Sequence, residues 1–166
     1  GAASLYFGSG FVAERGNNWL TGMYANYNIY KTKDSRYVSV GCLEKKFWTN
    51  LCNALERTDL IDLIDCEENH PYLKEQLTLE FEKRTMAEWE TYLNGKDTCV
   101  TPILNFAEAC DAEQTKANEM VLTVNDEELG EYKQIGFAMK LSKTPAQLSK
   151  RAPRLGEDNK EILGED

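Results

Sequence analysis

Alternating side chains mark two strands in the first third of the chain. Tyr, Ile, Val and Thr favour extended backbone from Asn26 to Thr32 and from Arg36 to Val40, where successive residues fall on opposite faces. Turn-forming residues separate the two runs at Lys33-Asp34-Ser35-Arg36. The pattern predicts a β-hairpin.

A period of three to four residues predicts the helices that follow. The first is expected from Glu44 to Leu55, and its apolar residues form one buried stripe. A shorter helix is expected over residues 59–64, then a loop over 65–69, then a helix over 71–83. Thr85 and Glu88 form a capping box that begins another helix, and Gly95 ends it.

The remainder of the chain predicts short elements and a tail. β-branched residues favour a strand over 98–104, where Pro102 requires an edge or an end. Asn105 and Glu108 repeat the capping pattern for a short helix through Cys110. The other expected elements are a polar link (116–119), a strand (120–124), an acidic turn (125–130), one or two strands (132–141), an extended tail from Ser142 and a last helical turn over 157–163.

The first 13 residues are small and apolar, which is typical of a helix end or a packed segment rather than a surface N-terminus. The chain also opens without Met, as if it began inside a larger protein. We therefore expect apolar surface at residues 1–13 and 120–141 wherever such a neighbour is missing.

Composition restricts the kinds of molecule that the chain can be expected to bind. The 166 residues suffice for one domain or for one and a part, and 42% hydrophobic residues can bury a core. A formal net charge of −9 argues against nucleic acid and anionic membrane surfaces as partners. No apolar run approaches the roughly 20 residues that span a bilayer. The five cysteines lack C-x-x-C spacing, so a disulfide framework or zinc knuckle is not expected, and a cytoplasmic location is.

Glu44 is the carboxylate with the most site-like position. It lies where a strand passes into a helix, and α/β proteins commonly build sites at such sheet ends. The alternative is that Glu44 only stabilises the helix N-terminus, where the helix dipole favours negative charge. Position and residue type alone leave both readings open.

Other candidate residues have plainer explanations. His70, the single histidine, precedes Pro71 at a helix start, so we expect a structural role and no metal site. Trp19 lies in a loop and could contact a ligand or simply fill a gap. Trp48 and Trp89 fall on buried stripes. The acidic residues between 62 and 68 are expected to form a solvated face.

A set of motifs in fixed order carries a more specific signal. They are Arg15-Gly16-Asn17, Leu20-x-Gly22, Tyr27-x-x-Tyr30-x-Thr32-x-Asp34, Tyr37-Val38-x-Val40-Gly41-x-Leu43-Glu44-x-x-Phe47-Trp48, Phe81-x-Lys83-Arg84-Thr85-x-Ala87-Glu88-Trp89, Gly95-x-Asp97-x-Cys99-Val100-Thr101-Pro102-Ile103-Leu104, Glu108-Ala109 and Ala152-Pro153-Arg154-Leu155-Gly156-Glu157 with Glu161-Ile162-Leu163. Together they resemble the family III CoA-transferases, and within them the α-methylacyl-CoA racemase branch. Met23, Ala25, Asn28 and Ser35 depart from the family pattern, which favours Gly, Pro, Asp and Gly there.

The resemblance implies an α/β fold and an acyl-CoA substrate. Residues 1–25 would end a Rossmann-like large domain, 26–118 would form the small α/β domain, and 119–166 would return to the large domain. The family forms interlocked dimers and needs no cofactor. Its racemases move the α-proton of a 2-methylacyl-CoA with a His and an Asp, and its transferases form an aspartyl intermediate.

The resemblance carries two site residues onto this chain. Glu44 would orient the catalytic histidine, and Tyr27 would lie near the acyl group. The family's catalytic Asp and His correspond to positions before Gly1. Three readings therefore stand: a racemase part, a CoA-transferase part, or a folded fragment without activity of its own.

Overall fold

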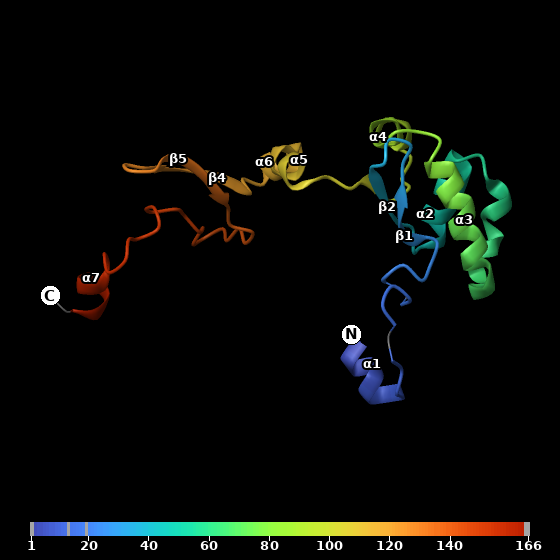
Figure 1. Cartoon of the computed structure of the whole chain (residues 1–166), viewed down its shortest axis with the longest axis horizontal. Helices are drawn as coiled ribbons and strands as arrows, with labels where there is room; N and C mark the ends of the chain where they lie inside the picture. Colours follow the sequence, from blue (N-terminus) through green and yellow to red (C-terminus); the bar gives the residue numbers. More distant parts are fainter. Residues whose placement is uncertain (1, 13, 19, 165–166) are drawn as a thin grey trace. The chain divides into compact units, whose positions relative to one another are not determined.

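The chain forms two units of structure, one ending at Ile103 and one beginning at Leu104. The computed structural model describes residues 2–12, 14–18 and 20–164. Each unit combines helices with a small antiparallel sheet (Figure 1), so the expected mixture of helix and sheet is confirmed. The domain borders expected after residues 25 and 118 stay predictions.

The predicted hairpin is present in the first unit. Strands β1 (Tyr27–Lys31) and β2 (Tyr37–Gly41) pair antiparallel, with Tyr27 opposite Gly41 and Lys31 opposite Tyr37. β3 (Val100–Pro102) adds to the other side of β2, so that Pro102 lies on an edge strand as expected. Ser35 in the turn adopts a φ of 61°, a conformation that glycine takes without steric cost. That geometry accounts for the glycine that the resemblance places at this turn.

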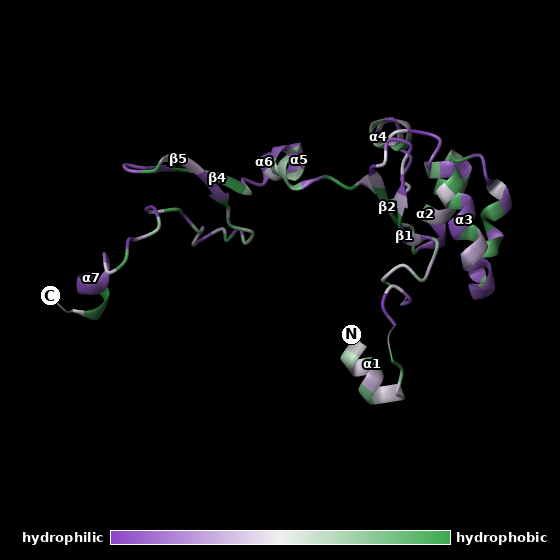
Figure 2. Cartoon of the chain, in the orientation of Figure 1, coloured by the Kyte–Doolittle hydropathy of each residue, from purple (hydrophilic) through white to green (hydrophobic). Residues whose placement is uncertain are grey.

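Helices cover one face of this sheet. They are α2 (Lys45–Ala54), α3 (His70–Phe81) and α4 (Met86–Leu93). Figure 2 shows both hydrophobic and hydrophilic residues along α3, of which Leu73, Leu77 and Phe81 are buried while Tyr72 and Leu79 remain exposed. The predicted helices over 44–55, 71–83 and from Thr85 are confirmed within one or two residues at their ends. The capping box of Thr85 and Glu88 is formed in full.

The core lies between these helices and the sheet. Tyr30, Val38 and Val40 face it from the strands. Trp48, Leu51, Leu73, Leu77, Phe81 and Trp89 meet them from the helices, each with no exposed surface. Both tryptophans are thus core residues, as expected. At about 25 cal/mol per Å² of apolar surface removed from water, this burial is the main source of stability for the first unit.

Two short segments differ from expectation. The helix predicted over 59–64 is instead a pair of 3₁₀ turns, Thr58–Leu60 and Asp62–Asp65, and the loop that follows contains a third, Glu67–Asn69. Only Leu60 is buried among the residues of these turns, so the segment lacks the continuous apolar stripe that would favour a longer α-helix.

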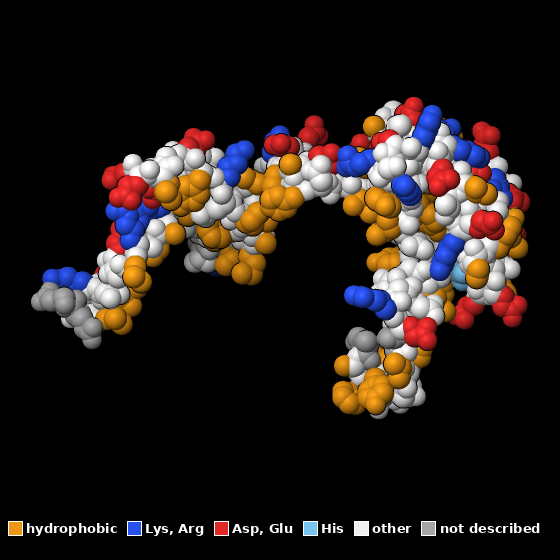
Figure 3. All heavy atoms as spheres, viewed as in Figure 1, with side chains coloured by type: hydrophobic (Ala, Val, Ile, Leu, Met, Phe, Trp, Pro, Cys, Tyr) orange, Lys and Arg blue, Asp and Glu red, His pale blue; other side chains and the backbone are white. Residues whose placement is uncertain are grey.

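Helix α1 (Ala2–Ser9) confirms a helical start, but its described side chains are exposed. Tyr6 and Phe7 have 54% and 84% of their surface in contact with solvent, and hydrophobic side chains gather over this helix (Figure 3). The expectation of a packed segment is wrong for this chain by itself. The structure agrees instead with the other expectation, that this segment exposes apolar surface where no neighbour covers it: described side chains from 3 to 12 are exposed.

The second unit contains α5 (Phe106–Asp111), α6 (Glu113–Ala117), α7 (Asn159–Leu163) and a hairpin of β4 (Val121–Asp126) and β5 (Gly130–Ile135). The capping box at Asn105 is formed as predicted. The polar link expected over 116–119 begins inside α6, and the strand expected over 132–141 ends at Ile135. The hairpin thus has two strands, the smaller of the two numbers that the sequence allowed, and β4 and β5 extend into the turn expected over 125–130.

The tail is fixed to the β4–β5 turn by charged groups. Arg151 binds Asp126 at 3.1 Å and Glu157 at 2.8 Å, and Arg154 binds Glu128 at 2.8 Å. The hydrogen bonds from Arg151 and from the Arg154 backbone N–H lower the pKa of Glu157 to about 2. The expected extended tail is thus ordered by ion pairs rather than by apolar contacts.

Gly136 marks a close approach of two backbones in this unit. Its N–H donates to the carbonyl of Met120 at 2.8 Å, and a Cβ built at this position would lie 2.2 Å from the carbonyl oxygen of Glu119. We expect Gly136→Ala to destabilise the hairpin by about 1–3 kcal/mol, because the backbone itself must shift. Amide hydrogen exchange across β4 and β5 measures the effect. Gly8→Ala, where a Cβ meets nothing within 4 Å, should leave that exchange unchanged.

All five cysteines are free, with Cys42 and Cys52 buried and Cys66 and Cys99 exposed. Over the described residues, no helix is both long and apolar enough to cross a membrane.

Candidate functional site

Glu44 lies at the junction between β2 and α2, as predicted. It is the N-cap residue of α2, with extended backbone (φ −77°, ψ 136°), and its carbonyl accepts the N–H groups of Phe47 and Trp48 at 3.0 and 3.2 Å. Its carboxylate makes no capping hydrogen bond and is exposed. The backbone of Glu44 therefore starts the helix, while its side chain is not used for capping. That division weakens the purely structural reading of Glu44.

The backbone on either side of Glu44 is anchored in the core. After it, Trp48 is fully buried and its Nε1–H donates to the carbonyl of Ile61 at 3.1 Å. Before it, Cys42 is fully buried, and its thiol donates to the carbonyl of Thr98 at 2.8 Å. Burial raises the pKa of the Cys42 thiol to about 12, so this group is a neutral donor and not a nucleophile. The junction is thus a rigid support for an exposed carboxylate.

Tyr27 lines a hollow of about 420 Å³ on the outer face of the sheet. The hollow is bounded by Leu20 and Gly22 from the preceding loop, by Ile29 and Gly41 from the hairpin, and by Cys99. Tyr27 is half-buried there, and Ile29 is 58% exposed. An apolar floor with a phenol at one side suits an acyl chain or another small apolar group.

Glu44 is not among the residues that line this hollow, but its negative charge acts on Cys99, which does line it. Burial raises the pKa of the Cys99 thiol, and the negative charges of Asp97 and then Glu44 raise it further. The backbone of Cys99 also joins the sheet, since its carbonyl accepts the N–H of Gly41 at 3.0 Å. The structure therefore brings the two predicted site residues to the same end of the sheet without placing them in one cavity.

His70 has the structural surroundings that its position predicted. It is buried, its Nδ1 accepts the N–H of Ala25 at 3.2 Å, and its ring lies 4.7 Å from that of Tyr24. Asn69, the N-cap residue of α3, does not cap with its side chain. The structural role of His70 is therefore to fix the backbone at Ala25, just before β1.

His70 gives the fold a pH dependence near neutrality. Burial, and then the charge of Lys74, lowers its pKa, although Glu67 acts in the opposite direction. The unfolded chain, with a histidine pKa of about 6.5, takes up a proton before the folded chain does. The free energy of unfolding should therefore be full above about pH 6.5 and fall as the pH drops below it. Urea unfolding of the chain at pH 7.5 and 5.5 measures this.

A variant without the histidine separates its contribution to the pH dependence of stability from that of the carboxylates. His70→Asn cannot titrate in this range, so its free energy of unfolding should be lower than that of the natural chain at pH 7.5 but nearly equal at the two pH values. An equal pH dependence in both chains would contradict the assignment to His70.

The other candidates were Trp19 and the acidic residues between 62 and 68. Trp19 lies outside the described residues. The acidic residues between 62 and 68 are largely exposed, as expected, and Lys45 lies 2.6 Å from Asp65 and 3.9 Å from Asp62. Among the residues that the structure describes, no group of three His, Cys, Asp or Glu side chains could hold a metal ion.

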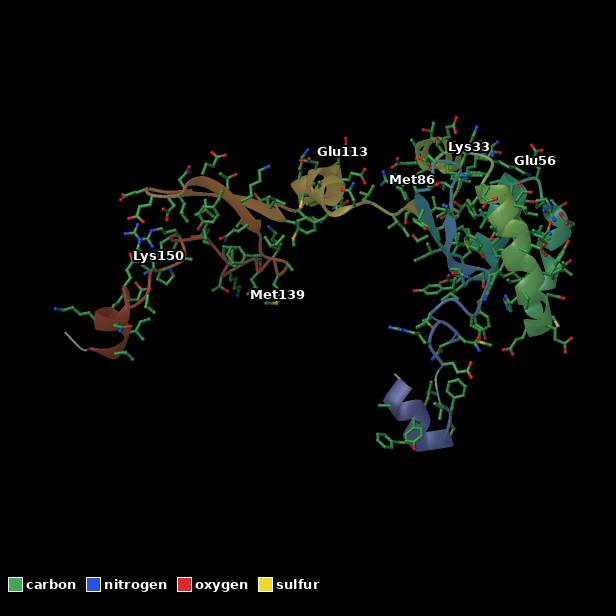
Figure 4. The ribbon with its side chains drawn as sticks, in the orientation of Figure 1. Lys33, Glu56, Met86, Glu113, Met139 and Lys150 are labelled. Atoms are coloured by element: carbon green, nitrogen blue, oxygen red, sulfur yellow. The ribbon has the colours of Figure 1, made fainter. Side chains whose placement is uncertain are left out.

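Two polar residues that fix the hairpin were given no role from the sequence: Asn26, next to Tyr27, and Asp34, in the turn at the opposite end of the hairpin. Asp34 accepts the hydroxyl of Thr32 at 2.5 Å and the N–H of Met86 at 3.2 Å, which ties the hairpin turn to α4. Lys33 adds a backbone bond to Arg84 at 3.0 Å, and Lys33 and Met86 lie close together in Figure 4. Asn26 joins β1 to Cys42. The Thr-x-Asp spacing hinted at Asp34, whereas nothing local marks Asn26.

Comparison with known proteins identifies the family. The model of CoA-transferase family III matches residues 2–159. Alpha-methylacyl-CoA racemase of Mus musculus is 35% identical over 154 residues, which is 91% of this chain and 39% of that protein. Formyl-CoA:oxalate CoA-transferase of Streptomyces coelicolor is 38% identical over 80 residues, which is 47% of this chain and 19% of that protein. The chain belongs to CoA-transferase family III.

The fold of the chain is similar to that of a solved structure. A CAIB/BAIF family protein from Brucella suis superposes with a TM-score of 0.71 at 18% identity, over 98% of this chain and 43% of that one. At that identity the likeness concerns the fold alone. The chain spans about 40% of the length of the racemase and of the Brucella protein.

Proposed function

We propose that this chain is part of a longer enzyme that exchanges the α-proton of a 2-methylacyl-CoA. The observation that carries the proposal is the extent of the likeness to the mouse racemase, 35% identity over 91% of the chain. The transferase from Streptomyces matches less than half of it. The Leu43-Glu44-x-x-Phe47 motif lies inside the region that the racemase covers.

The chemistry assigns distinct roles to this chain and to the rest of the protein. A thioester carbonyl acidifies the α-carbon, and two bases on opposite faces can then remove and return the proton. The bases would come from the rest of the longer protein. Glu44 would orient one of them, a histidine, and the hollow beside Tyr27 would receive part of the acyl group. Proton exchange of this kind requires no cofactor.

A CoA-transferase is the second candidate. The likeness to the Streptomyces enzyme favours it, and the same fold serves both reactions. In a transferase, a carboxylate of the longer protein would attack the donor thioester, release CoA thiolate and hold the acyl group as a mixed anhydride. The thiolate would then attack the enzyme carbonyl and release the donor acid, which leaves an enzyme–CoA thioester. The second acid would take CoA from that thioester by the same steps in reverse. The hollow would then hold the acyl group of donor or acceptor in the same place.

One pair of assays separates the two reactions. The longer protein that contains these residues is incubated in D₂O with a 2-methylacyl-CoA, and deuterium at the α-carbon is followed by mass spectrometry. In parallel it receives an acyl-CoA and an isotope-labelled free acid. Deuterium without labelled thioester supports the proposal, and labelled thioester without deuterium replaces it with the transferase.

The isolated chain is expected to have no turnover, because neither base is assigned to it. We also propose an interlocked homodimer in the cytoplasm for the longer protein. Turnover by the purified 166-residue chain, verified by mass, would contradict the division of roles.

A further inference from the structure

We infer that Asn26 is a positioning residue for Glu44, acting through Cys42. The inference rests on the proposed function, since it concerns the same carboxylate. Asn26 lies outside the motifs shared with the family, and it binds Cys42, two positions before Glu44.

Asn26 makes two hydrogen bonds to one residue, Cys42. Its carbonyl accepts the N–H of Cys42 at 2.8 Å, and its side-chain Nδ2–H donates to the carbonyl of Cys42 at 2.9 Å. Two facing residues of an antiparallel pair normally exchange two backbone bonds. Here the side-chain amide supplies the second bond, one position beyond the last strand pair, Tyr27 with Gly41. Asn26 therefore extends the order of the sheet toward the junction.

Asn26 is itself well fixed. It is 7% exposed, and the preceding residue, Ala25, is fully buried. The N–H of Ala25 donates to His70 at 3.2 Å, and its carbonyl accepts the hydroxyl of Tyr30 at 2.6 Å. The segment that holds Cys42 is thus anchored both to α3 and to β1.

On the N-terminal side of Glu44, two side-chain hydrogen bonds among the described residues hold Cys42: the one from Asn26 and the one from the Cys42 thiol to Thr98. Leu43 is 46% exposed, and the Glu44 side chain does not cap α2. Cys42 is therefore the last core contact before Glu44, and loss of its carbonyl bond would let the junction move. A small displacement of an orienting group lowers the rate of a reaction far more than it lowers stability.

The arrangement has a cost that packing alone does not explain. The Oδ1 of Asn26 is buried without a hydrogen-bond partner among the described residues. An apolar residue of similar size would avoid this cost but would leave the Cys42 carbonyl without the Asn26 donor. Leucine at this position removes both the donor and the unpaired acceptor, and it tests the donor with little loss of volume.

The test compares Asn26→Leu with Tyr92→Phe. Tyr92 donates to the carbonyl of Ala54, at the other end of α2, at 2.6 Å, so both variants remove one side-chain donor to a backbone carbonyl of this region. In the longer protein, Asn26→Leu should lower kcat for α-proton exchange about tenfold and leave KM within about twofold, whereas Tyr92→Phe should leave both unchanged.

A double variant and an exchange measurement complete the test. In the Glu44→Gln background, Asn26→Leu should have less than about a twofold effect, because it acts through that carboxylate. In the 166-residue chain, the Cys42 amide should exchange with solvent about tenfold faster in Asn26→Leu than in Tyr92→Phe. If Asn26→Leu does not fold, Asn26→Ala lacks the same donor and adds no bulk.

The outcomes separate the two proposals. If Glu44→Gln lowers exchange while Asn26→Leu behaves like Tyr92→Phe, the inference on Asn26 is wrong and the function stands. If the two effects multiply in the double variant, Asn26 does not act through Glu44. If Glu44→Gln has no effect, the proposed role of Glu44 fails, and the inference fails with it.

Discussion

Glu44→Gln in the longer protein is expected to slow α-proton exchange about a hundredfold or more, the lower end of what a positioned acid or base contributes. Glutamine keeps the size of the side chain and removes its charge. A histidine that relies on Glu44 for its orientation and for stabilisation of its protonated form would lose both. Exchange is followed as deuterium incorporation at saturating substrate, so that the comparison reports kcat.

The same substitution should barely change stability. The carboxylate is exposed and does not cap α2, so only its favourable interaction with the helix dipole, a few tenths of a kcal/mol, is lost. Glu56→Gln is the matched control, since Glu56 is an exposed glutamate just beyond the other end of the same helix. Exchange at the natural rate in Glu44→Gln, with Glu56→Gln also unchanged, would remove Glu44 from the mechanism.

Trp89→Ala is expected to cost the first unit about 3–5 kcal/mol, the range for large aromatic deletions in cores. Trp89 has no exposed surface, its ring lies 5.1 Å from that of Phe81, and its Nε1–H donates to the Phe81 carbonyl at 2.8 Å. The guanidinium of Arg84 lies 4.6 Å from the ring. Since domains of this size have total stabilities of about 5–15 kcal/mol, much of the folded population could be lost.

Trp89→Phe distinguishes packing from the hydrogen bond. It keeps an aromatic ring in the core and removes the donor, so we expect a smaller loss, partly from the missing bond at about 1 kcal/mol. Urea midpoints of the three chains, followed by far-UV circular dichroism, give the comparison. Equal losses in the two variants would mean that the hydrogen bond, and not the volume, determines the effect.

The elements that the sequence predicted well are those with local signals. Alternation over residues 26–40 required one face of the hairpin to be buried, and the structure buries Tyr30, Val38 and Val40. The two capping boxes each lie within four residues, so their hydrogen bonds can be recognised from spacing alone.

The elements that were missed depend on partners far along the chain. In the segment of 3₁₀ turns between α2 and α3, Leu60 is fully buried while Ile61, Leu63 and Ile64 are only partly buried against the core, an arrangement that no helical period marks. Asn26 and Cys42 are separated by 16 positions, and Asp34 and Met86 by 52. Such contacts are set by the fold as a whole, so a polar residue at either position reads locally as an ordinary turn or strand residue.

The candidate site divides in the same way. The place of Glu44 at the end of β2 followed from the strand and helix patterns, and the structure confirms it. Its role, and that of Tyr27, came from the resemblance and stay predictions. The hollow beside Tyr27 could not be foreseen, because its walls come from a loop, a hairpin and the residue before β3.

The reactivity of the free cysteines can be used to measure local opening of the fold. Cys66 and Cys99 are exposed and can react with a thiol reagent in the folded state. Cys42 and Cys52 are buried, and burial raises the pKa of each to about 12, so at neutral pH they are both shielded and protonated. Cys42 lies beside the junction that holds Glu44, and Cys52 lies on the buried side of α2. The rate at which a thiol reagent modifies Cys42 and Cys52 therefore measures how often the segments around Glu44 and α2 open locally. No added label is needed.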